Sequence, residues 1–282
     1  MADKEIHLAE SNLFGDQDAV PIKAVDMEDG THALRVEGGL VANGGVPPNV
    51  TRRLSIEGRN NAVSQGTTWV DIWEGGSDII PEPNPLGETI TVNSTSINDT
   101  IAGTGVQKVR VEYLNTLEQL TFVDIDMNGT TPVTAAGISN MTDIIDLYAI
   151  QLGSGGTSDG NIDVYLTGTP TTIYTRIVAG GNKSQSTLRH LLPSSTFYLT
   201  SMTVSTNTKS TEVALRATNN DSGDVFDKVY LYQVPLVMSD SPLQIIFNPA
   251  IVIPPNSRMK VSAKTTSPNT QVAIWIDGWV KV

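Results

Sequence analysis

The stretch KVRVEY, residues 108–113, decides the fold class, because its apolar and charged side chains alternate. In an extended strand, its two valines and its tyrosine lie on one face and its charged residues on the other. The same alternation recurs in EVALRA at residues 212–217 and in RMKVSAK at residues 258–264. One apolar and one charged face is typical of strands that pack on one side only. The sequence therefore predicts an all-β protein.

Clusters of Gly, Asn, Ser and Pro separate these runs at short intervals. They include NG at residues 128–129, GSGG at 153–156 and PPN at 254–256. Such residues supply the positive or fixed φ angles that turns require. Only NMTDIIDLY, residues 140–148, suits a single short helix instead of a strand.

Two breaks divide the chain. PEPNP at residues 81–85 cannot sit inside a sheet, because alternate residues lack an N–H donor. A Gly- and Ser-containing stretch at residues 179–186 forms the second break. The predicted units are an extended N-terminal arm, residues 1–82, and two jelly-roll-like β-sandwich domains, residues 83–180 and 181–282. A single larger sheet assembly after the arm is the alternative.

The predicted arm is rich in acidic residues, Gly and Asn. Its apolar runs, such as ALRV at residues 33–36, are too short and too separated to build a core, so we expect it to order on a partner. Its first residues, MADKEIH, do not form a secretory signal, and no apolar run is long enough for a bilayer. We therefore expect synthesis in a cytoplasm and no membrane partner.

Composition excludes several classes of function. Eighteen basic against thirty acidic residues give a net charge of -12, which repels nucleic acid unless the basic residues form a patch, and none is evident in the sequence. The chain has no cysteine, which removes disulfides, thiolate metal sites and cysteine nucleophiles. No Gly-rich stretch carries the lysine of a phosphate loop. We expect no cofactor.

Catalytic and metal-binding residues are also not evident. His7 and His32 fall in the predicted arm and His190 follows the second break, so none has the setting of a catalytic base. Acidic residues are common, but no pair stands out for glycoside cleavage. DIDMNG at residues 124–129 matches the start of a calcium loop, but Ala135 stands where the closing glutamate belongs. The sequence predicts neither an enzyme nor a metal site.

The four tryptophans are the candidate interface residues. They occur in two similar pentapeptides, WVDIW from Trp69 to Trp73 and WIDGW from Trp275 to Trp279. In a strand, both tryptophans and the aspartate of each copy project from one face. Exposed tryptophan anchors protein partners or stacks on sugars. For Trp275 and Trp279, packing against the core is the alternative.

From residue 69 to the end, the chain resembles a loosely defined group of structural proteins of tailed-phage virions. The similar segments are WVDIWEGG (69–76), ITVNSTS (90–96), IAGTGVQKVRV (101–111), MNGTTPV (127–133), the Gly/Asn-rich segment 152–163 and IPPNS (253–257). These segments contain strand and turn chemistry and no reaction centre.

The resemblance implies a capsid-decoration, cement or head-fibre protein, located in the virion after synthesis in the host cytoplasm. Its implied partners are the major capsid protein or other virion proteins. We further expect a homo-oligomer, a trimer by analogy with capsid sites of threefold symmetry. A tail-associated receptor- or glycan-binding protein is the alternative, and a shallow site containing Trp and Asp side chains would favour it.

Overall fold

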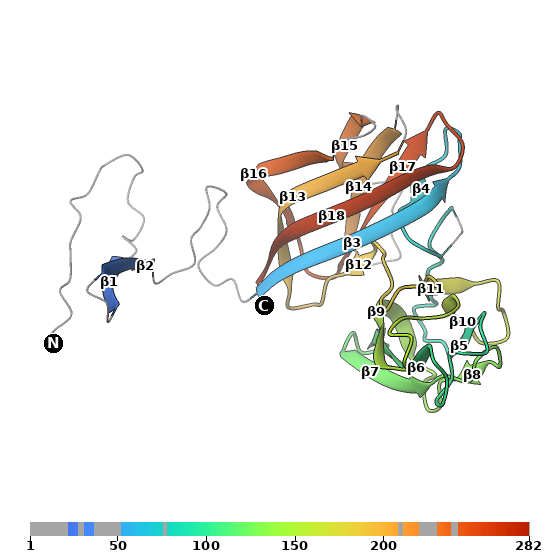
Figure 1. The fold of residues 1–282 in the computed structure, drawn as a ribbon. Coiled ribbons are helices and arrows are strands. Elements are labelled where there is room, and N and C mark those ends of the chain that lie inside the picture. Colours follow the sequence, from blue (N-terminus) through green and yellow to red (C-terminus); the bar gives the residue numbers. More distant parts are fainter. Residues whose placement is uncertain are drawn as a thin grey trace.

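The chain folds entirely into strands, turns and loops in the part that the computed structural model describes (Figure 1). The described residues are 22–27, 31–36, 52–75, 78–207, 211–219, 230–237 and 242–281. They contain no helix, and so none that could span a membrane. The all-β prediction is confirmed.

The short helix expected at residues 140–148 was wrong, because this stretch opens strand β9 (Met141–Leu152). β9 pairs with β6 (Val106–Asn115), and the pairing register skips Thr142 and Ile145 as bulges. These bulges give the apolar residues a spacing of three, which imitates a helical period.

Two sheets form the first β-sandwich, which we call the proximal sandwich (Figure 1). One sheet has the order β16 (Leu243–Ile253), β13 (Thr196–Thr206), β18 (Thr270–Lys281) and β3 (Arg52–Val63). The other has the order β12 (Arg189–His190), β17 (Ser257–Thr265), β14 (Thr211–Asn219) and β15 (Tyr230–Val237), with β4 (Val70–Asp71) also on β17. Side chains from both sheets, including Phe197, Ile276 and Val261, fill one core.

The second sandwich is inserted into the chain between β4 and β12, and we call it the inserted sandwich. One of its sheets has the order β11 (Ile173–Ile177), β10 (Ile162–Leu166), β5 (Ile90–Ser94) and β8 (Val133–Thr134). The other has the order β7 (Leu120–Asp126), β6 and β9. Its core is separate and includes Val92, Val111 and Val164.

The arm predicted over residues 1–82 is too long, because residues 52–75 belong to the proximal sandwich. β3 pairs along β18, and Ile56 and Ile72 are completely buried in its core. The apolar residues of this segment are too sparse for a core of their own. They are buried because β3 pairs with β18, from the far end of the chain, and shares its core. Nearer the N-terminus, β1 (Ile22–Met27) and β2 (Thr31–Val36) pair as an antiparallel hairpin. Residues 1–21, 28–30, 37–51 and 76–77 of the predicted arm, among them His7, lie outside the described part.

A buried polar cluster joins the two sandwiches. Asp143 of β9 lies with its Oδ2 atom 3.0 Å from His190 Nδ1 and 3.0 Å from Arg258 Nε. Arg258 also pairs through Nη1 with Glu82 at 2.9 Å. Buried charges are tolerated when they are paired in this way. His190 therefore has a buried ion-pair partner in Asp143, which accounts for its burial.

Candidate interaction surface

Strand β18 places two tryptophans and an aspartate on the outer face of the proximal sandwich. Its buried residues, such as Ile274 and Ile276, alternate with Trp275, Asp277 and Trp279. The tryptophans are 47% and 37% exposed. The alternative that they pack in the core is therefore wrong.

Neighbouring strands extend this face in two directions. Trp279 lies opposite Tyr198 of β13 on one side and opposite Arg53 of β3 on the other, and Tyr198 lies opposite Val252 of β16. Directly opposed residues in a sheet have Cβ atoms about 4.5–5.5 Å apart. An apolar row therefore crosses β16, β13 and β18 and ends at an arginine of β3.

Further residues from β16 widen the apolar surface. Ile246 is 72% exposed and Val252 is 53% exposed, whereas the next residue after each is buried. Ile246 lies opposite Ser201, which lies opposite Asp277. We call the surface formed by Tyr198, Ile246, Val252, Trp275 and Trp279 the Trp face.

Asp277 lies between the two tryptophans and is held by strand β3. Its Oδ1 atom accepts hydrogen bonds from Arg53 Nη2 at 2.9 Å and from the Ser55 hydroxyl. Exposed ion pairs contribute little to stability, so the main consequence is a fixed position for the carboxylate. The arrangement offers two aromatic rings and one oriented acceptor to a partner.

The other two tryptophans lie elsewhere. Trp73 is 1% exposed and packs inside the chain. The centroid of the Trp69 ring lies 4.2 Å from Lys264 Nζ on β17 and 5.0 Å from Arg216 Cζ on β14. Both strands belong to the sheet that does not contain β18. The structure therefore brings together only Trp275 and Trp279 among the four predicted candidates.

The acidic motif at residues 124–129 lies on and just after β7. Arg110 Nε donates to Asp124 Oδ1 at 2.7 Å, and Lys108 Nζ lies 3.0 Å from Asp126 Oδ1. The guanidinium lowers the pKa of Asp124 below its ordinary value through this hydrogen bond. Across the described residues, no group of three or more His, Asp or Glu side chains could hold a metal ion.

Sequence reasoning missed Tyr198, Ile246 and Val252 as members of the surface. Each has an apolar neighbour that enters the core, so the local pattern does not mark them as exposed. Only the pairing register of β16, β13 and β18 places them beside the tryptophans.

Comparisons with known proteins add no family. No protein-family model and no curated protein matches the chain. The structure of infectious bursal disease virus Gx strain matches with a TM-score of 0.22 and 10% identity, over 81% of this chain and 70% of that one. VP17, a capsid protein of bacteriophage P23-77, matches with a TM-score of 0.15 and 9% identity, over 83% and 98%. TM-scores this low carry no argument about function.

Proposed function

We propose that this chain is a non-enzymatic structural component of a phage particle, which stabilises the capsid surface as a cement or decoration protein. The observation that carries the proposal is the Trp face, an open surface of aromatic and aliphatic side chains on a four-stranded sheet. Contiguous exposed apolar surface marks protein interaction sites, and tryptophan is enriched where binding energy concentrates.

The proposed partner is the major capsid protein or another virion protein, and the chain acts as a homo-oligomer, a trimer. The two sandwiches supply the body that carries the Trp face. The sequence resemblance to virion structural proteins supports the same role, because it covers the inserted sandwich and all of the proximal sandwich except strand β3.

A reconstitution experiment tests the proposal. Phage particles produced without this protein are incubated with the purified full chain, and binding is measured by co-sedimentation. We expect the wild-type chain to bind and the double variant Trp275→Ala/Trp279→Ala to bind at least about 30-fold more weakly, since hot-spot residues contribute about 2 kcal/mol or more. A cryo-EM map of the reconstituted particle should show density at regular capsid positions.

The matched control is Phe122→Ala, which removes another exposed aromatic ring, on the inserted sandwich. This variant should bind particles as the wild-type chain does. Equal binding by all three proteins would exclude the Trp face as the contact. Density at the tail alone would exclude the capsid role.

One observation favours a second function, that of a tail-associated receptor- or glycan-binding protein. Two tryptophans flank an oriented carboxylate on one open face, and aromatic faces stack on sugar rings while carboxylates accept their hydroxyl hydrogens. Binding of the wild-type chain to host surface glycans, abolished in Asp277→Asn, would support this function over the structural one.

A further inference from the structure

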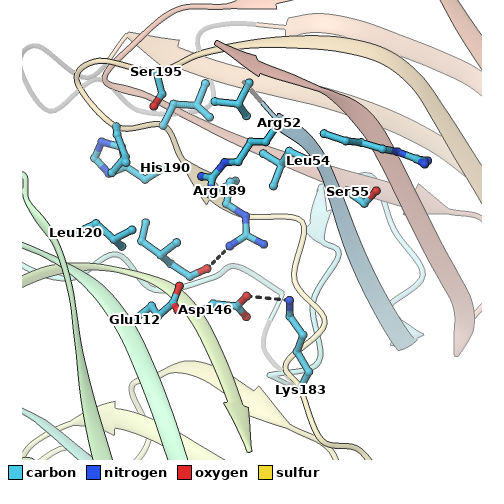
Figure 2. A pocket seen from close by; sticks show the side chains of 15 residues that line it. Arg52, Leu54, Ser55, Glu112, Leu120, Asp146, Lys183, Arg189, His190 and Ser195 are labelled. Carbon is cyan, nitrogen blue, oxygen red and sulfur yellow. Dashed lines mark hydrogen bonds and ion pairs between the residues drawn. The ribbon is translucent and has the colours of Figure 1, made fainter. Parts of the chain in front are cut away.

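A cavity of about 250 Å³ lies between the two sandwiches (Figure 2). Strand β3 and the segment around residues 189–195 supply one wall, and strands β6, β7 and β9 of the inserted sandwich supply the other. Its apolar lining consists of Leu54, Leu120, Ile145, Leu191, Leu192 and Val280. The volume suits one or two side chains of a bound segment.

The polar lining of the cavity carries cations with unused bonding capacity. Arg52 has no ion-pair partner among the described residues, and Figure 2 shows it beside Arg189. Arg189 donates from Nη1 to the Ile145 carbonyl, but its buried Nε has no hydrogen-bond partner in the described part of the chain. Ser195 is 3% exposed, and its hydroxyl also has no partner there. Buried polar groups of this kind are costly unless a ligand satisfies them.

The acidic groups of the cavity are already engaged. Glu112 Oε1 accepts a hydrogen bond of 2.8 Å from the Tyr148 hydroxyl, and Asp146 Oδ2 lies 2.8 Å from Lys183 Nζ. Among the described residues, the polar groups of the cavity without a partner are therefore the Arg52 guanidinium, Arg189 Nε and the Ser195 hydroxyl. They are suited to a carboxylate, which accepts paired hydrogen bonds from guanidinium groups.

The N-terminal segment of this chain has the complementary charge. Residues 1–37 contain nine acidic residues and three basic ones, Lys4, Lys23 and Arg35, so their net charge is 3 − 9 = -6. That is half of the net charge of -12 that the whole chain carries. The acidic residues are Asp3, Glu5, Glu10, Asp16, Asp18, Asp26, Glu28, Asp29 and Glu37.

The connection between segment and cavity also fits. Residues 38–51 carry no charged side chain, and the next residue, Arg52, lines the cavity. Fourteen residues span at most about 50 Å, enough for the acidic segment to return to the cavity of its own chain. Such tethering gives an effective concentration of about a millimolar.

We propose that the cavity between the sandwiches binds the acidic segment, residues 1–37, of the same chain. A carboxylate of the segment pairs with Arg52 and Arg189, and an adjacent aliphatic side chain packs against the leucines of the cavity wall. This proposal does not depend on which partner the Trp face binds.

Disulfide trapping in the full-length chain tests the proposal, and the chain is suited to it because it has no native cysteine. Leu120→Cys places a thiol at the cavity, and Asp18→Cys or Glu28→Cys places one in the acidic segment. We expect rapid oxidation to a cross-linked monomer. Adding Arg52→Glu should slow the cross-link at least tenfold, and so should high salt, which screens the charge pairing.

The matched control is Leu117→Cys, an exposed position three residues away that does not line the cavity. It should cross-link at least tenfold more slowly than Leu120→Cys. Equal rates at positions 117 and 120, or a rate unaffected by Arg52→Glu in a chain with an unchanged melting temperature, would overturn the proposal. Covalent dimers in place of cross-linked monomers would assign the site to a second copy and would also overturn it.

Discussion

The two Trp-x-Asp-x-Trp pentapeptides have the same spacing but differ in exposure to solvent. Asp71 and Trp73 of the first are buried, whereas Trp275 and Trp279 of the second are exposed. In WVDIW, residues 69–73, Val70 and Ile72 enter the core, and in WIDGW, residues 275–279, Ile276 does. Trp and Asp therefore occupy the face away from the core in both copies. In the first copy other parts of the chain cover that face, whereas in the second it is open. Alternation thus determines the direction of a side chain, but distant segments determine whether it is exposed.

The two aspartates show the energetic side of this difference. Asp71 is buried, and its carboxylate accepts hydrogen bonds from Lys260 Nζ at 2.9 Å, Ser262 Oγ at 2.6 Å and Ile80 N at 2.9 Å. Asp277 makes its bonds to Arg53 and Ser55 near solvent. Removing one partner of a buried ion pair leaves the other charge desolvated and unpaired. At an exposed ion pair, water takes the place of the removed partner.

The largest effect is therefore expected at Asp71. Asp71→Ala should lower the free energy of unfolding by about 3–5 kcal/mol, because the ammonium of Lys260 stays buried without its carboxylate. Urea unfolding followed by tryptophan fluorescence measures this value. A loss below about 1 kcal/mol would show that Asp71 is not buried as described.

A smaller effect is expected at Gly278, where the second pentapeptide has glycine and the first has Ile72. A Cβ atom there would collide with the Tyr198 carbonyl and the Phe197 ring. Gly278→Ala should therefore cost about 1–3 kcal/mol of stability by overpacking. Ala273→Ser, at an exposed position on the same strand, is the control and should change unfolding by less than about 0.5 kcal/mol.

The sequence was sufficient for the parts of the fold that depend on local alternation. KVRVEY at residues 108–113 forms part of β6 as predicted, and both pentapeptides orient their residues as alternation requires. The pairing of β3 with β18 was not predictable in this way, because it joins residues more than two hundred positions apart. The bulges of β9 were missed because they disrupt the period on which strand prediction depends.

Only part of the candidate surface could likewise be predicted from local alternation. Trp275 and Trp279 were identified from the sequence, because large aromatics at alternate positions of a strand share a face. Their neighbours Tyr198, Ile246 and Val252 come from other strands, and the register that unites them depends on the folded sheet. The buried setting of Trp73 was likewise beyond local pattern.

The open tryptophans should contribute little to stability. Trp275→Ala and Trp279→Ala should each lower the free energy of unfolding by about 1 kcal/mol or less, the range of single cross-strand pairs. Their effect on particle binding, by contrast, should exceed tenfold. A loss of several kcal/mol in unfolding would show that the Trp face is a structural element covered by another part of the chain.

The smallest effect is expected at Asp277. Asp277→Asn keeps the shape of the side chain and removes its charge, and its partner Arg53 is largely exposed. The cost to stability should be about 0.5 kcal/mol or less and should vanish in molar salt, because exposed pairs are screened. Unfolding of both proteins at low and high salt measures it. Water can compensate for the lost carboxylate in the free energy of unfolding but not in the recognition of a ligand. A variant with an unchanged free energy of unfolding that no longer binds a ligand would therefore assign Asp277 to binding.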